Sequence, residues 1–131
     1  MRYNARVAKK RILSISYDDA LLKTRAMMLQ SAGLDVTSAY GFTEALAFCG
    51  KQYDLIIICH SIPRGDKASL GESIRKGKCG QILSLRRPGA LPMEQAEWSV
   101  DASKPEAMLS AVRDILGVPD AARRKRKPLS K

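Results

Sequence analysis

The stretch Tyr53-Asp-Leu-Ile-Ile-Ile-Cys-His-Ser-Ile-Pro63 contains the strongest structural signal in this chain. Its consecutive aliphatic residues, from Leu55 to Ile58, are typical of a strand that helices cover on both faces. Pro63 then indicates a sharp turn. We therefore expect a central strand over 54–59 that presents Cys59 at the carboxyl end of a parallel sheet.

Short apolar strands and helical patterns alternate on both sides of this segment. Further strands are expected at 11–16, 34–39 and 81–85 and within 98–102. Helices are expected from Asp18-Asp19 to Gly33, from a Thr43 cap to Phe48, from the Ser69-Leu-Gly-Glu72 capping box to Gly77, and from Pro105 to Gly117. In the first of these helices, Lys23 and Arg25 are interpreted as polar positions.

The segment 86–92 is too rich in proline and glycine for regular structure. The helix after the fourth strand should therefore be short, within 93–96. The alternation of elements predicts an α/β fold with five parallel strands, helices on both faces and right-handed crossovers.

The charge of the chain is concentrated at its two ends. The chain has 131 residues and a net charge of +10, and its length fits one domain. All acidic residues lie between 18 and 120, where Lys and Arg nearly balance them. This divides the chain into a basic N-terminal arm (1–9), a domain (10–117) and a basic tail (118–131) that is expected to be disordered.

The basic tail could make a weak contact with nucleic acid. Its cluster comprises Arg123, Arg124, Lys125, Arg126 and Lys127. Neutralising phosphates with these charges would give a log–log salt slope of roughly −4 to −5. The cluster has no interleaved aromatic residue that could stack on bases, so a solvated tail is the alternative.

Cysteine content and hydropathy indicate a reduced, cytoplasmic setting. The chain has 3 cysteines, which cannot all pair within one chain, and it has no CxxC motif. The apolar run in 55–59 is too short to cross a bilayer, and polar residues interrupt the segment that follows the charged N-terminus. We expect no secretory signal and no membrane contact.

From Lys10 to Gly117 the chain resembles the receiver domain of two-component response regulators. The opening segment Arg11-Ile-Leu-Ser-Ile-Ser-Tyr-Asp-Asp-Ala-Leu-Leu22 corresponds to the first strand and loop of that family, and Tyr53–Pro63 to its third strand. The resemblance implies a flavodoxin-like, doubly wound fold and a place in phosphorelay signal transduction.

The same resemblance places other residues where receivers carry their phosphorylation chemistry. Cys59 stands at the position of the phosphoacceptor aspartate, and Ser16 and Tyr17 stand at those of the two acids that hold Mg²⁺. Mg²⁺ requires oxygen ligands in near-octahedral geometry. Asp18 falls one place late, and a strand slip that brought it into the site would turn the apolar residues out of the core.

Two further family positions have counterparts here. The hydroxyl residue at the end of the fourth strand corresponds to Ser84 or Leu85, depending on register. Lys104-Pro105 matches the Lys-Pro pair of receivers, whose peptide bond is usually cis in the family. The alternative is a capping box over 103–106 with Lys104 in solvent.

Cys59 and His60 adjoin each other but are not expected to form a catalytic pair. Neighbouring side chains at a strand end point to opposite sides. An inert, packed cysteine is expected, with a redox-sensing or ligand-sensing thiol as the alternative if Lys104 lies close enough to lower its pKa. A soft-metal site made of Asp18, Cys59 and His60 is conceivable, but nothing in their spacing requires it.

Together these residues predict a degenerate, stand-alone receiver that works through phosphorylation-independent contact with a partner protein. Asp18, His60, Ser84 and Pro105 are the further pocket candidates. We expect no enzymatic activity, no metal and no cofactor, because the acids that phosphoryl transfer needs are missing. An unconventional phosphorelay receiver and a nucleic-acid adaptor remain the alternatives.

Overall fold

Short apolar segments of the chain form one parallel sheet. The computed structural model describes residues 9–118. In chain order its elements are β1 (Arg11–Ser16), α1 (Asp19–Ser31), β2 (Asp35–Tyr40), α2 (Gly41–Phe48), β3 (Leu55–Ile58), α3 (Arg64–Gly77), β4 (Ile82–Arg86), β5 (Trp98–Asp101) and α4 (Pro105–Leu116). The sheet has 5 strands in the order β2-β1-β3-β4-β5. This is the predicted doubly wound, flavodoxin-like architecture.

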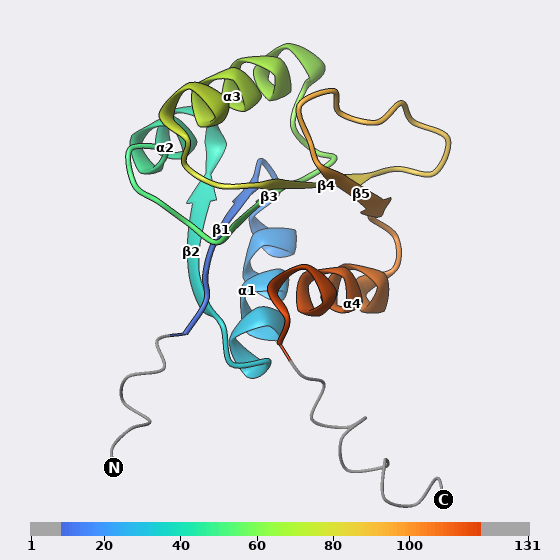
Figure 1. Ribbon diagram of the computed structural model, residues 1–131. Coiled ribbons are helices and arrows are strands. Elements are labelled where there is room, and N and C mark those ends of the chain that lie inside the picture. Colours follow the sequence, from blue (N-terminus) through green and yellow to red (C-terminus); the bar gives the residue numbers. More distant parts are fainter. Residues whose placement is uncertain (1–8, 119–131) are drawn as a thin grey trace, which may run out of the picture.

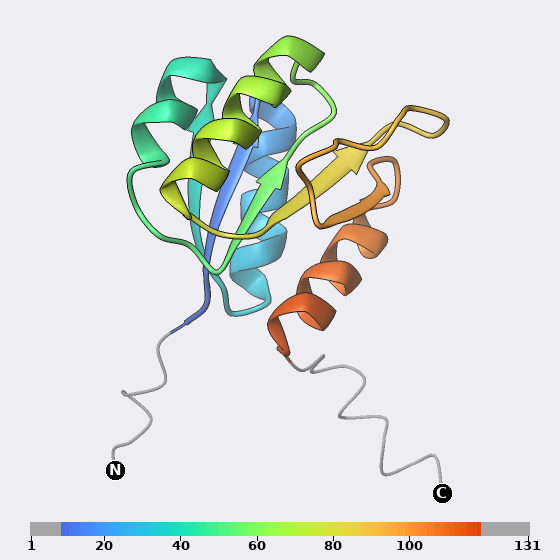
Figure 2. The same cartoon turned by 45° about the horizontal axis from the view of Figure 1, so that its top comes forward.

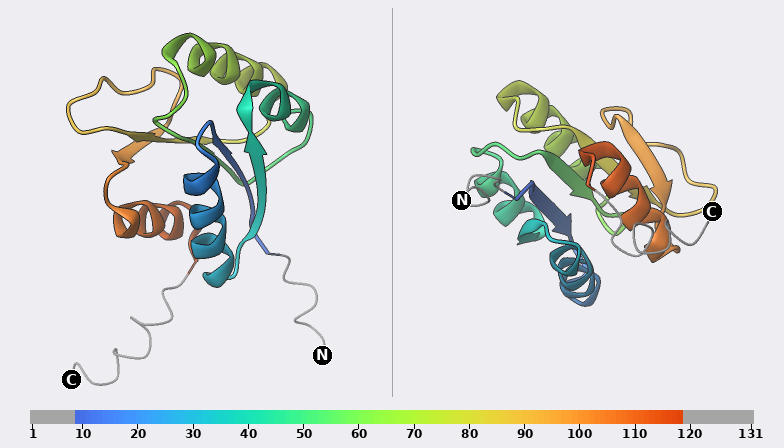
Figure 3. Two further views of the ribbon diagram at one scale, coloured as in Figure 1. Left: turned by 180° about the vertical axis from the view of Figure 1, so that it is seen from behind. Right: turned by 60° about the horizontal axis from the view of Figure 1, so that its bottom comes forward.

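Helices cover both faces of the sheet (Figures 1 and 3). Alternate side chains of each strand point to opposite faces. Leu13, Ile15 and Ile56 therefore pack with α2 and α3, whereas Ile12 and Ile57 pack with α1 and α4. Every residue of β3 is buried, which accounts for its uninterrupted aliphatic sequence.

The strand order places a topological switch point between β1 and β3. Chain connections leave these neighbouring strands in opposite directions, and such crevices at the carboxyl ends of strands are where open α/β sheets bind ligands. Ile15 lies opposite Ile58 in the β1–β3 register. Residues 16–18 and 59–61 therefore emerge side by side from the sheet.

Two helices begin earlier than the sequence patterns suggested. The predicted caps at Thr43 and Ser69 are wrong, because α2 begins at Gly41 and α3 at Arg64. The side chain of Glu44 accepts a hydrogen bond from the backbone N–H of Tyr40 at 2.7 Å, which starts α2. Pro63 precedes α3 as its N-cap in an extended conformation, with φ −59° and ψ 151°, which suits the fixed φ of proline, and the helix follows at once.

The predicted short helix at 93–96 is wrong; this segment forms a turn within a long β4–β5 loop. Met93 is buried, and its side chain and that of Gln95 lie against Gly71 of α3. A Cβ on residue 71 would come within 2.8 Å of the Met93 methyl carbon. Figure 2 shows the long loop between β4 and β5. It packs on α3 by side-chain contact, where a helix was expected.

The basic ends predicted at 1–9 and 118–131 lie almost wholly outside the described residues. Residues 1–8 and 119–131, with the basic cluster of the tail, lie outside the described residues. Within 9–118, none of the helices has the length and apolar character needed to cross a membrane.

Candidate functional site

The carboxyl ends of β1 and β3 bring two serines together. Ser16 is buried at the end of β1, and its Oγ lies 3.3 Å from that of Ser61, which follows β3. Ser61 Oγ also accepts a hydrogen bond from the backbone N–H of Tyr17 at 3.0 Å. These contacts close the crevice between the two strands with hydroxyl groups.

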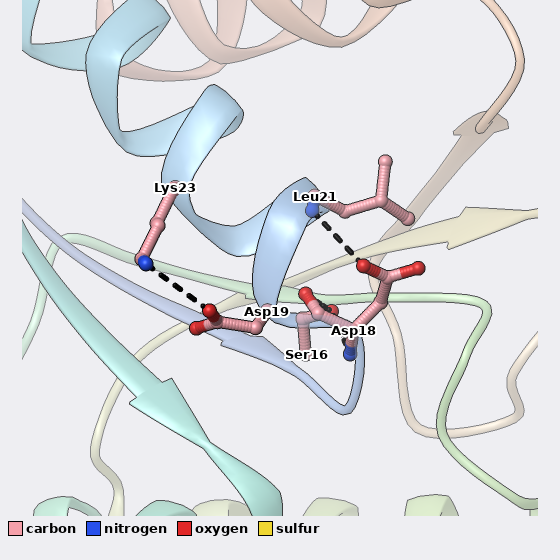
Figure 4. Close-up of polar contacts among 5 residues, drawn as sticks. All are labelled: Ser16, Asp18, Asp19, Leu21 and Lys23. Carbon is pink, nitrogen blue, oxygen red and sulfur yellow. Dashed lines mark hydrogen bonds and ion pairs between the residues drawn. The ribbon is translucent and has the colours of Figure 1, made fainter.

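Asp18 is the N-cap of a helix beside this crevice. Its Oδ1 accepts from the backbone N–H of Leu21 at 3.1 Å, so it is the N-cap of α1 (Figure 4). The Asp18 N–H donates to Ser16 Oγ at 3.0 Å. β1 keeps the unslipped register, with Ile12 to Ser16 buried, so no strand slip moves Asp18 inward.

The Tyr17 side chain is directed toward α3. Its hydroxyl donates to Asp66 Oδ2 at 2.7 Å. Burial, followed by the hydrogen bond and charge of Asp66, raises the pKa of Tyr17 well above its usual value. Tyr17 is thus a neutral donor at the position that carries an acid in receivers, and it engages the nearest α3 carboxylate.

Cys59 is fully buried and is paired with an arginine. Arg25, on α1, donates from Nη1 to Cys59 Sγ at 2.9 Å and is itself only 7% exposed. The backbone N–H of Ser61 lies 3.5 Å from the same sulfur. Burial raises the pKa of the Cys59 thiol, but hydrogen bonds from Ser61, Ser16 and Arg25 outweigh it, so the pKa is lowered overall.

Further positively charged side chains lie near the Arg25–Cys59 pair. Burial lowers the pKa of His60, and the nearby cations Arg25, Arg87 and Lys67 lower it further. Arg87 Nε donates to His60 Nδ1 at 3.3 Å, so the partner of His60 in this structure is Arg87. The pKa of Lys67 is lowered by burial, and the charge of Cys59 partly opposes that shift.

The residues of β4 and β5 contribute less to this crevice. Ser84 is fully buried opposite Ile58, and its hydroxyl has no hydrogen-bond partner among residues 9–118. Leu85, one residue later, packs on the other face of the sheet. By register, Ser84 shares the face of the sheet that α2 and α3 cover.

Lys104 is exposed and is the N-cap of α4, followed by Pro105. Its charge acts on Asp101, and it is not among the groups that shift the Cys59 pKa. The bond before Pro105 is trans, as are all those described, unlike the cis form that the resemblance implied. The alternative capping box is also wrong, because the Ser103 hydroxyl bonds Asp101 Oδ1 at 2.7 Å and makes no cap.

The sequence interpretation missed Arg25, Ser61 and Lys67, all of which interact with Cys59. Arg25 was read only as a polar position of the first helix, and its burial was not predicted. A signal was present in the spacing, because Leu22, Arg25 and Leu29 recur at helical intervals and all three are buried on one side of α1. An arginine on an apolar stripe indicates a buried partner.

The donor set of the crevice suits an anion better than a hard cation. Ser16, Tyr17 and Cys59 carry no carboxylate, and a guanidinium bonded to Cys59 repels a divalent ion. Within residues 9–118, no three His, Cys, Asp or Glu side chains form a group that could hold a metal ion. The structure therefore does not gather Asp18, Cys59 and His60 into a soft-metal site.

Solved structures with the same architecture are receiver domains. A putative response regulator from Chloroflexus aurantiacus is 23% identical and superposes with a TM-score of 0.72, covering 84% of this chain and 99% of its own. The receiver domain of the sensor histidine kinase PA1611 from Pseudomonas aeruginosa, solved with magnesium in its active-site cleft, is 21% identical with a TM-score of 0.69 over 84% of this chain and 99% of its own.

The Thermotoga maritima response regulator TrrA, solved in complex with Mg²⁺-BeF, is 22% identical with a TM-score of 0.67 over 81% of this chain and 98% of its own. No protein-family model and no curated protein matches the sequence. At these identities the likeness establishes architecture alone. The chain has the CheY-like, flavodoxin-type fold of response-regulator receiver domains.

Proposed function

We propose that this chain is a receiver-like signalling module that binds a partner protein without phosphoryl transfer to residue 59. It is not an enzyme in this proposal. The observation that carries it is the contact between Arg25 and Cys59, because a buried guanidinium is bonded to the residue at the position where receivers carry an acceptor carboxylate. Electrostatic support for phosphoryl transfer would require a metal and carboxylates that Ser16 and Tyr17 cannot supply.

Internal hydrogen bonds support a pocket that stays closed. Ser16 and Ser61 bond one another, and Tyr17 bonds Asp66. A phosphoryl group would have to displace these partners and would leave buried polar groups unpaired, at a cost of roughly 1–3 kcal/mol each. Such a crevice favours a conformation that stays the same over one that changes on phosphorylation.

The long β4–β5 loop is the proposed partner surface. It replaces a helix, and with the first turn of α3 it encloses a cavity of about 640 Å³. Arg64 and Lys67 line one side of this cavity, while Leu91, which is 74% exposed, lines the other. A partner with an apolar side chain beside a carboxylate would complement it.

Beryllofluoride with Mg²⁺ provides a direct test, because it is the ligand seen in the TrrA structure. We expect a ¹⁵N–¹H NMR titration of the full chain to show no saturable shifts at residues 16–18, 59–61 or 87–97. Mg²⁺ alone and fluoride alone serve as controls. Saturable shifts at the first two segments that require both components would overturn the proposal in favour of an unconventional phosphorelay receiver.

A further inference from the structure

The cysteines of this chain occupy two opposite environments. Cys49, Cys59 and Cys79 are all free and buried. Cys49 follows α2 and Cys79 precedes β4, where the Cys79 thiol donates to the Cys49 carbonyl oxygen. Cys59 lies at the carboxyl edge of the sheet, the end opposite to Cys79. The chain therefore offers an internal comparison between Cys59, which hydrogen-bond donors surround, and the pair Cys49 and Cys79, which have few donors around them.

Arg25 requires an anion, and the structure offers it Cys59. A buried charge is stable only when it is paired and hydrogen-bonded. No carboxylate within residues 9–118 forms an ion pair with Arg25, and its hydrogen bond goes to Cys59 Sγ at 2.9 Å. The charge of Arg25 is therefore balanced when the sulfur is a thiolate.

The surroundings of the sulfur favour the thiolate. The backbone N–H of Ser61 points to it at 3.5 Å, and the Ser16 hydroxyl also bonds it. Lys67 adds a second positive charge that interacts with Cys59. At the other site, burial raises the pKa of Cys49 to about 11 and also raises that of Cys79.

We propose that Cys59 and Arg25 form a buried thiolate–guanidinium pair, and that this pair is a site of oxidation by small hydroperoxides. The inference goes beyond the partner-binding function and does not depend on it. Cys59 is fully buried beneath the half-buried residues His60 and Ser61. Only a small oxidant that passes this turn reaches the sulfur, which excludes bulky electrophiles.

The reaction with hydrogen peroxide is a two-electron transfer. The thiolate sulfur attacks one peroxide oxygen, an S–O bond forms, and the O–O bond breaks. The sulfur becomes a sulfenic acid, and the leaving hydroxide takes a proton from solvent to become water. Arg25 is a positioning residue that holds the thiolate and faces the charge that develops on the leaving oxygen.

Peptide mapping after peroxide treatment tests the proposal on the full chain. The folded, reduced protein is exposed to hydrogen peroxide at neutral pH, the peroxide is removed with catalase, and the protein is then unfolded in denaturant that contains dimedone, which traps the sulfenic acid. We expect adducts on the Cys59 peptide at least about tenfold above those on Cys49 and Cys79. Equal or faster labelling of either of those cysteines would overturn the proposal.

Two charge-removing substitutions on α1 form a matched pair. Arg25→Met should slow oxidation of Cys59 at neutral pH by about tenfold and move its rate profile to higher pH, whereas Arg25→Lys should restore part of the rate. Lys23→Met removes an exposed charge from the same helix and should leave the rate unchanged. An unaltered profile in folded Arg25→Met contradicts the proposal.

If Arg25→Met does not fold, the proposal is tested on the wild-type protein alone. The pH dependence of Cys59 oxidation should then have its midpoint below that of a free cysteine peptide measured alongside it. A midpoint at or above the peptide value overturns the thiolate pair.

Discussion

At the scale of single residues, hydroxyl groups and a thiol line the crevice at the carboxyl ends of β1 and β3. Ser16, Tyr17 and Cys59 stand where the resemblance to receivers implied carboxylates, and the cation at the centre of the crevice is the Arg25 side chain. The resemblance pointed to these three residues. It could not point to Arg25, because the contact joins α1 to the end of β3 and its two residues are 34 positions apart in the sequence.

The pH dependence of stability separates the two thiol environments. Burial raises the folded-state pKa of Cys49 from 9.0 to about 11. The protonated form is favoured in the fold, so this contribution is complete below pH 9.0 and is lost as pH rises toward 11. Cys59 has the opposite sign, since its pKa is lowered and its contribution is lost as pH falls through the folded value.

We therefore expect Cys49→Ala to lose less stability than the wild type between pH 9 and pH 11. Across this window the free energy of unfolding should fall by about 2 kcal/mol less in Cys49→Ala than in the wild type. Urea unfolding under reducing conditions at several pH values measures it. Parallel stability curves for the two proteins would show that Cys49 does not titrate as its burial implies.

At the scale of elements, runs of apolar residues and glycines that end helices were sufficient to predict most strand and helix boundaries. β3 lies within the predicted 54–59, and α4 ends at Gly117, which has φ 70° as a left-handed cap. The start of α3 was missed because Gly65 resembles a loop residue although it lies in the first turn. The form of the β4–β5 loop depends on its contact with Gly71, which no local pattern reveals.

Two glycines provide a test of this element-level packing. A Cβ on residue 80 would lie 2.7 Å from the backbone oxygen of Tyr53, where β3 and β4 begin side by side. A Cβ on residue 65 in α3 would meet nothing within 4 Å. Gly80→Ala should therefore destabilise the fold by roughly 1–3 kcal/mol.

Gly65→Ala should stabilise the protein by roughly 0.5–1 kcal/mol, because alanine restricts the unfolded chain and favours a helix. Chemical denaturation of both variants beside the wild type gives the two free energies of unfolding. A neutral Gly80→Ala variant would mean that β4 approaches Tyr53 less closely than described.

At the scale of the whole molecule, the scaffold and the chemistry of a receiver are separable. The central strand and the parallel sheet with helices on both faces were predictable from the alternation of apolar strands and helical patterns, whereas the doubly wound order was what the resemblance to receivers implied. The contact of the basic tail with nucleic acid stays a prediction, since residues 123–127 lie outside the described residues. Lys104 illustrates this separation of scaffold from chemistry. The Lys104-Pro105 motif matches the family, but the Lys104 side chain is exposed.

Intact-mass analysis after incubation with acetyl phosphate and Mg²⁺ tests the central claim most directly. The account predicts that the wild-type chain keeps its unmodified mass, because Arg25 bonds a cysteine and no carboxylate among residues 9–118 forms an ion pair with it. A phosphoryl adduct that requires Mg²⁺ and disappears in a Cys59→Ala variant would contradict it.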